Sequence, residues 1–295
     1  MMGQIAIYFQ CSFSENHILN IASIISSNPK VIQLSMFFPL MKTPGLDGFC
    51  DLMYQSPNNW ENRIHKSVSI YLLWSDGQSW NSKKLNEMKY GDYLRVTTQN
   101  IEKDCLTTGL ALIYPSIDQL DSKLVALPNK KVWFSEIPAW RNTSGFYNEH
   151  TQVSYQADIE PLPPRASLLT FHPFIQFGNV VNNLLVLNAT VDPKIQSGKI
   201  SLFNSYDKSY IADSEISTNS LTTIPLDIYD FKPTDLPVFY SPTIAGIPFG
   251  LGIAKSGKML SLEHTHPPAS LVLHGDRRGV QGKIKKSWIE KLVRA

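Results

Sequence analysis

The chain has 295 residues, of which 43% are hydrophobic and 18% charged, and its 27 basic side chains nearly balance 25 acidic ones. A net charge of +2 excludes a protein that coats nucleic acid through overall basic charge, and the apolar content excludes an intrinsically disordered chain. The length suffices for one large folded domain or two smaller ones.

The first residues and the cysteines both favour the cytoplasm. Residues 1–10 carry no positive charge, which argues against a secretory signal peptide. No window holds the roughly 18 uncharged apolar residues that a transmembrane helix requires. Cys11, Cys50 and Cys105 are odd in number and widely spaced, so we expect small buried thiols in a reducing compartment. We therefore predict a cytoplasmic protein without a transmembrane segment.

The first half of the chain is predicted to combine one helix with several strands. Apolar side chains at three- and four-residue spacing predict a helix over residues 15–26. Asp76-Gly77 predicts a tight turn at the end of a strand, because glycine adopts positive φ without strain. Short apolar or alternating runs predict strands over residues 31–38, 68–74, 93–98 and 110–114.

The second half is predicted to be built from regularly spaced strands, as in β-sandwiches and barrels. Residues 160–165 contain three prolines, which donate no backbone hydrogen bond, so this stretch is expected to be an extended connector. We place a domain boundary between residues 140 and 165, with a mixed α/β region over 1–150 and a β-sandwich-like domain over 151–295. The predicted strands cover residues 151–157, 167–177, 184–191, 199–203, 222–229, 238–240 and 247–253.

The C-terminus is predicted to be a basic amphipathic helix. Ile284, Trp288 and Leu292 recur every four residues within residues 280–293, with lysines between them. Residues 274–295 carry a net charge of +5, which leaves −3 for the rest of the chain. We expect the apolar stripe to pack on the protein, and the alternative is docking on an anionic partner. The predicted fold is therefore α+β and mainly β, with an antiparallel sandwich-like domain and a C-terminal amphipathic helix.

Three of the seven histidines cluster near the C-terminus, at His264, His266 and His274. If residues 260–266 form a strand, His264 and His266 share one face, and Glu263 points to the other. Two imidazoles on one face can bind a divalent metal, zinc or iron, when a third ligand completes the site. The alternative, which we favour, is a structural role in which the imidazoles hydrogen-bond backbone carbonyls.

Arginines near this cluster and in mid-chain are candidate ligand-binding residues. Arg277 and Arg278 lie between two glycines, where guanidinium groups can approach a carboxylate or phosphate, although a surface turn accounts for the same residues. Arg141 follows Trp140, and an aromatic face beside a guanidinium group is typical of a sugar site or of the edge of a core.

The sequence holds no G-x-S-x-G elbow, P-loop, dinucleotide fingerprint or H-E-x-x-H motif. We therefore predict a ligand-binding or assembly module whose partner is a small molecule or a protein. A metal-dependent enzyme using His264 and His266 is the first alternative, and recruitment of nucleic acid by the C-terminal helix is the second and weaker one. The predicted contact residues are Arg141, Glu263, His264, His266, His274, Arg277 and Arg278.

Overall fold

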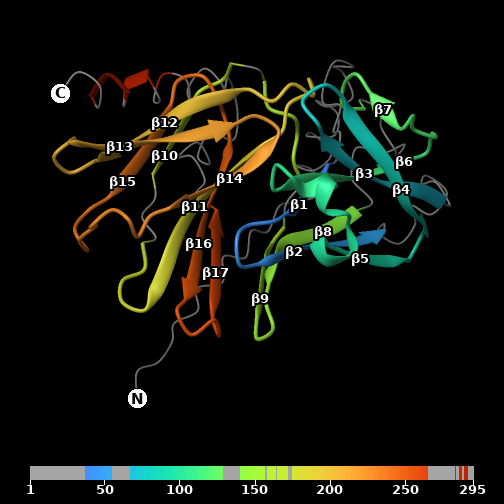
Figure 1. The fold of residues 1–295 in the computed structure, drawn as a ribbon, viewed down its shortest axis with the longest axis horizontal. Coiled ribbons are helices and arrows are strands. Elements are labelled where there is room, and N and C mark those ends of the chain that lie inside the picture. Colours follow the sequence, from blue (N-terminus) through green and yellow to red (C-terminus); the bar gives the residue numbers. More distant parts are fainter. Residues whose placement is uncertain are drawn as a thin grey trace, which may run out of the picture. The chain divides into compact units, whose positions relative to one another are not determined.

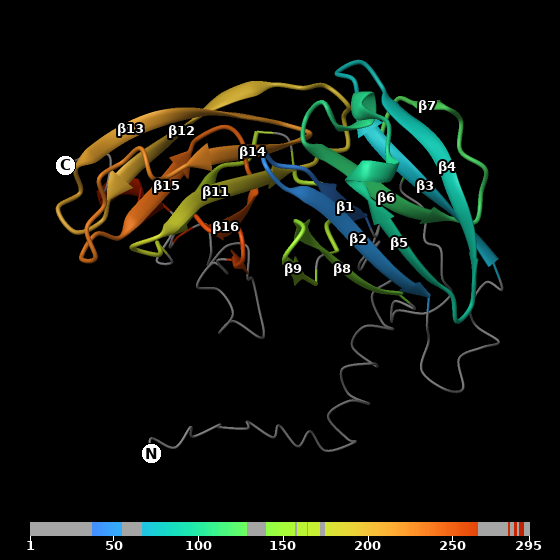
Figure 2. The same cartoon turned by 60° about the horizontal axis from the view of Figure 1, so that its bottom comes forward.

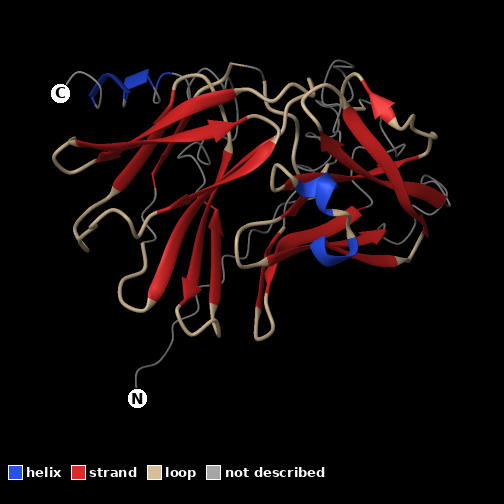
Figure 3. Cartoon of the chain, viewed as in Figure 1, coloured by secondary structure: helices blue, strands red, loops and turns tan. Residues whose placement is uncertain are grey.

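The computed structural model shows a mainly β protein with four antiparallel sheets among its described residues. Strands dominate in Figure 3, and before residue 265 the described helices are two short 3₁₀ helices, η2 (Thr98–Asn100) and η3 (Lys103–Leu106). The predicted helix over 15–26 lies outside the described residues. The structure describes residues 37–54, 67–128, 140–156, 158–163, 165–171 and 175–264, together with Lys283, Lys286, Ser287, Ile289, Glu290 and Lys291.

Two antiparallel sheets contain most of the first half of the described chain (Figure 1). β8 and β9 pair with each other across residue 150, so strands on both sides of the predicted domain boundary share one sheet, and that boundary stays a prediction. One sheet has the order β1 (Phe38–Met41), β6 (Leu110–Ser116), β3 (Ser67–Ser75), β4 (Trp80–Lys89) and β7 (Lys123–Leu124). The other has the order β5 (Tyr93–Thr97), β2 (Asp47–Tyr54), β8 (Trp140–Tyr147) and β9 (Gln152–Tyr155).

Two further antiparallel sheets form the second half, and Figure 2 shows them as neighbouring layers. A cluster of buried aliphatic side chains from both sheets, with Phe239, lies between them. One sheet has the order β10 (Leu168–Phe171), β15 (Pro237–Ser241), β12 (Ser197–Asn204) and β13 (Tyr210–Ser217). The other has the order β14 (Ser220–Pro225), β11 (Val180–Asn188), β16 (Ile247–Ala254) and β17 (Leu260–His264).

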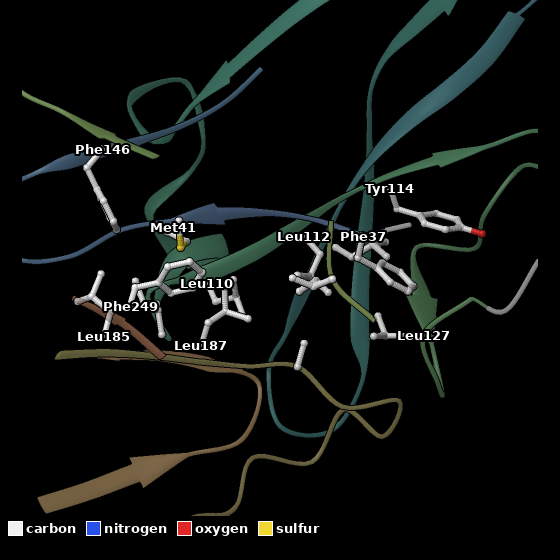
Figure 4. Close-up of a cluster of buried hydrophobic side chains, with 14 of the residues drawn as sticks. Phe37, Met41, Leu110, Leu112, Tyr114, Leu127, Phe146, Leu185, Leu187 and Phe249 are labelled. Carbon is white, nitrogen blue, oxygen red and sulfur yellow. The ribbon is translucent and has the colours of Figure 1, made fainter. Parts of the chain in front are cut away.

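The strand β11 is buried on both faces of its sheet. Leu184 and Val186 point into the cluster between the two C-terminal sheets, whereas Leu185 and Leu187 join a second cluster. That second cluster also contains Met41 and other side chains from the N-terminal sheets, and Figure 4 shows the two groups facing each other. Because side chains alternate along a strand, two buried faces require a continuous apolar run, which is what residues 184–187 supply.

The predicted hairpin turn at Asp76-Gly77 is confirmed. Gly77 has φ +86°, and the Asp76 Oδ1 atom accepts hydrogen bonds from the backbone N–H groups of Gln78 (2.8 Å) and Ser79 (2.7 Å). A hydrogen bond from the Asn81 side chain, followed by these backbone bonds, lowers the pKa of Asp76 because such bonds favour the ionised carboxylate. The turn between β3 and β4 is therefore stabilised by Asp76 and Gly77, the two residues from which it was predicted.

The C-terminal segment is described at six positions, and all six are helical. Lys283, Lys286 and Lys291 are exposed and Ile289 is half-buried, and the amphipathic helix as a whole stays a prediction. The other residues of the predicted helix over 280–293 lie outside the described residues. In the described part of the chain, no helix is both long and apolar enough to cross a membrane.

Candidate functional site

The structure describes two of the predicted contact residues fully, Glu263 and His264, both at the end of β17. Glu263 pairs with Gly250 and is exposed, and His264 pairs with Phe249 and is half-buried, so the two side chains lie on opposite faces as predicted. The backbone of Arg141 lies in β8, but its side chain is outside the described residues. His266, His274, Arg277 and Arg278 also lie outside the described residues.

His264 is part of a cluster of three rings. Its imidazole stacks on Tyr155 of β9, with centroids 5.2 Å apart and an interplanar angle of 25°, and meets Phe249 edge-on at 5.2 Å. Tyr155 and Phe249 also contact each other, with centroids 5.6 Å apart. Burial raises the pKa of Tyr155. These contacts join the edge strands of two sheets, and the hydrogen bonds expected from the His264 imidazole to backbone carbonyls stay a prediction.

The metal site that His264 and His266 would form is not tested, because His266 lies outside the described residues. Among the residues that the structure describes, no three His, Cys, Asp or Glu side chains gather closely enough to hold a metal ion. The zinc or iron alternative therefore stays a prediction.

An open cleft of about 1000 Å³ lies among the described residues. Five connections between strands line it: the β1–β2 turn, the β5–β6 connection with η2 and η3, the β8–β9 turn, the β11–β12 connection and the β13–β14 hairpin. The apolar lining is contributed by Pro44, Leu46, Leu106, Ile195 and Leu221. Hydroxyl, amide and charged groups come from Lys42, Thr43, Asp47, Gln99, Thr107, Thr108, Tyr147, Asn148, Glu149, Ser217, Ser220, Thr222 and Thr223.

The β1–β2 turn is fixed from both ends. Gly45 adopts φ +79° at its tip, and Leu46 is buried in the hydrophobic core. At the start of β2, a Cβ on Gly48 would lie 1.6 Å from the Met41 carbonyl oxygen, so only glycine allows this close crossing of the two strands. The turn therefore presents its polar side chains from a rigid base.

Asp47 is held by the 3₁₀ helix η2. Its Oδ1 atom accepts a hydrogen bond from the Thr98 hydroxyl (2.9 Å), and its Oδ2 atom accepts one from the Gln99 side-chain amide (2.8 Å). The same Thr98 oxygen accepts a hydrogen bond from the Gly48 N–H at 2.9 Å. Both carboxylate oxygens are thus engaged within the protein, and Asp47 shapes the wall of the cleft.

Backbone hydrogen bonds connect the segment between η3 and β6 to β14 and to the end of β1 at the cleft. The Leu221 N–H donates to the Thr108 carbonyl at 2.9 Å, and the Lys42 N–H donates to the Gly109 carbonyl at 2.8 Å. Gly109 has φ +72°, and a Cβ there would lie 2.9 Å from the Lys42 oxygen and 3.1 Å from the Leu221 oxygen. The base of the cleft is therefore preorganised by main-chain contacts.

Five side chains in the described lining remain available to a ligand: the hydroxyls of Thr107 and Ser217, and the side chains of Lys42, Tyr147 and Glu149. Within the described part of the chain, these side chains have no hydrogen-bond or ion-pair partner. Lys42 and Tyr147 are half-buried and Glu149 is exposed. The described lining contains neither histidine nor cysteine, so it offers no imidazole base and no thiol nucleophile.

Sequence reasoning did not find this cleft. Its lining residues come from positions between 42 and 223 that share no motif. The local signals are the paired threonines Thr107-Thr108 and Thr222-Thr223, and such pairs are typical of ordinary exposed strands and turns as well.

No protein-family model, curated protein or solved structure matches this chain.

Proposed function

We propose that this protein is a non-catalytic binding module that holds a polar ligand in the cleft between the β1–β2 turn and β14. The observation that carries the proposal is the composition of the lining: an apolar base surrounded by hydroxyl, amide and charged groups, with Lys42, Tyr147 and Glu149 unengaged. Binding sites combine apolar contact area with a few fixed polar groups in this way.

The rigidity of the base favours binding. The backbone bonds of Leu221 and Lys42 fix the segments before any ligand arrives, so little conformational entropy is lost on binding. The two C-terminal sheets and the core between them support a β-sandwich-like scaffold over residues 151–295, on which β14 presents one wall of the cleft. A cytoplasmic location, as the sequence predicts, belongs to the same proposal.

The experiment compares wild type with a variant whose cleft is filled. Thr107 is exposed at the cleft, so Thr107→Trp introduces a large ring there without disturbing the core. Val125 is 92% exposed and does not line the cleft, so Val125→Trp is the matched control. The probes are a panel of mono-, di- and trisaccharides and a library of displayed, randomised heptapeptides.

We expect at least one probe to raise the melting temperature of wild type and of Val125→Trp, because a ligand that binds only the folded state stabilises it. The same probe should have no effect on Thr107→Trp. The proposal fails if no probe binds wild type, or if bound probes stabilise Thr107→Trp as much as Val125→Trp.

A further inference from the structure

We infer that the ligand of the cleft is an extended polypeptide segment that adds to the free edge of β14 as an additional antiparallel strand. The inference rests on the proposed function and names the class of its ligand. β14 is an edge strand: it pairs with β11 on one side, and its other side opens into the cleft, which Ser220, Leu221, Thr222 and Thr223 line.

The backbone of β14 presents hydrogen-bonding groups to the cleft. In an antiparallel ladder, alternate residues direct N–H and C=O away from the neighbouring strand. Leu221 is such a residue, because its N–H donates to Thr108 and not to β11. Thr223, two positions further on, therefore faces the same way, and within the described part of the chain its N–H and C=O have no partner.

The edge is short but incompletely covered. Thr108 and Gly109 occupy it at Leu221, and Pro225 ends the strand without an N–H. Between them, Thr223 can exchange two hydrogen bonds with one residue of an added strand, and the Pro225 carbonyl can accept a third from the residue two positions away. Strand addition of this kind supplies affinity through the main chain, and side-chain contacts in the cleft supply selectivity.

The side chain of Thr223 does not obstruct this edge. Its hydroxyl lies 2.8 Å from the Thr43 hydroxyl, on the face of the sheet that packs towards the N-terminal sheets. The N–H and C=O groups point along the sheet and into the cleft. A carbohydrate would use the hydroxyl groups of the lining, whereas an added strand uses the backbone of Thr223, so the two ligand classes make different demands on this residue.

The test uses a pair of variants at Thr223. Thr223→Pro and Thr223→Val both remove the hydroxyl and its bond to Thr43, but only proline removes the N–H. Proline is accommodated on an edge strand where the N–H faces away from its neighbour. Heptapeptides selected from a displayed, randomised library on the full chain are synthesised, and their Kd is measured for both variants.

We expect the Kd for Thr223→Pro to exceed that for Thr223→Val by about tenfold, because the peptide carbonyl loses its donor. Hydrogen exchange on the wild-type protein provides a second readout that needs no variant, and the Thr223 amide should become protected when peptide binds. Equal Kd values for the two variants, or an unprotected Thr223 amide in the peptide complex, would overturn the inference.

Two other outcomes separate the inference from the proposed function. If saccharides bind in a manner that Thr107→Trp abolishes, while no selected peptide depends on the cleft, the strand addition is wrong and the binding function stands. If no probe depends on the cleft, both are wrong.

Discussion

The hydroxyl oxygens of Thr43 and Thr223 lie 2.8 Å apart, although 180 residues separate them in the chain. Thr43 precedes β2 of an N-terminal sheet, and Thr223 lies in β14 of a C-terminal sheet, so this bond connects the two halves at the cleft. Thr43 is almost completely buried and Thr223 is half-buried, so the bond is partly shielded from water. Because this bond holds the two walls of the cleft together, a substitution that breaks it should change both the free energy of unfolding and the geometry of the cleft.

The Thr43–Thr223 bond should appear as a coupling energy. We expect Thr43→Val and Thr223→Val each to lower the free energy of unfolding, and the double variant to lose about 1 kcal/mol less than the sum, because the second change removes a group already without its partner. Urea denaturation of the four proteins measures this coupling. A coupling energy of zero would show that the two hydroxyls do not interact in solution.

The crossing of β1 and β2 at Gly48 should not tolerate a methyl group. A Cβ at Gly48 would overlap the Met41 carbonyl, so we expect Gly48→Ala to lower the free energy of unfolding by about 3 kcal/mol or more. Gly45→Ala is the control: unlike Gly48, position 45 has positive φ, but nothing lies within 4 Å of its Cβ, and we expect a loss of only about 1 kcal/mol. Equal losses in the two variants would contradict the close crossing.

Asn219 should be essential to the β13–β14 hairpin. It is buried with φ +54°, its Oδ1 accepts a hydrogen bond from the Thr190 N–H (2.8 Å), and its Nδ2 donates to the Asp192 carbonyl (2.8 Å). Asn219→Gly preserves access to positive φ but leaves these groups unpaired, so we expect a loss of about 2–4 kcal/mol in chemical denaturation. A loss below about 0.5 kcal/mol would mean that backbone conformation alone selects this residue.

The thiol of Cys50 should be unreactive in the folded protein, and its titration should lower the free energy of unfolding as the pH becomes alkaline. Complete burial raises the pKa of Cys50 from 9.0 to about 12, more than the neighbouring Ser144 hydroxyl lowers it. Between these two pKa values the folded state holds a proton that the unfolded state releases. The contribution of the neutral Cys50 thiol to the free energy of unfolding is therefore complete below pH 9, and it is lost as the pH rises towards about 12.

Denaturation between pH 8 and 11 compares wild type with Cys50→Ala, whose stability should fall less steeply because this titration is removed. In the native state at pH 8, a thiol reagent should label Cys50 only on unfolding. Identical pH slopes, or rapid native-state labelling of Cys50, would contradict its burial as a neutral thiol.

The ring of His264 should matter more than its nitrogen atoms. We expect His264→Ala to lower the free energy of unfolding by about 1–2 kcal/mol, because Tyr155 and Phe249 lose a ring contact, and His264→Phe to restore most of this loss. Thermal melts with and without added zinc distinguish the metal alternative. Zinc that stabilised wild type but not His264→Phe would contradict a purely structural role and favour a metal site.

Many of the strands could be predicted from the sequence, because the spacing of apolar side chains along a strand follows which of its faces are buried. The apolar run of β11 and the alternating or apolar runs of β3, β5 and β6 all appear in the structure near their predicted positions. β4 and β13 escaped prediction because charged and polar side chains cover much of their surface, so neither shows a clear alternation. These two segments form strands because they pair with β3 and β12, and their own residue patterns do not predict it.

The β character of the chain, the turn at Asp76-Gly77 and a strand near residues 184–191 could be predicted locally, because backbone preference and side-chain patterning are local properties. Which sheets cover the two faces of β11, and which residues surround the cleft, depends on contacts between segments that are distant in the chain. Thr43 meets Thr223 because two core clusters set the positions of their sheets, and no spacing within the sequence encodes that meeting. The candidate site therefore became visible only when distant segments were brought together.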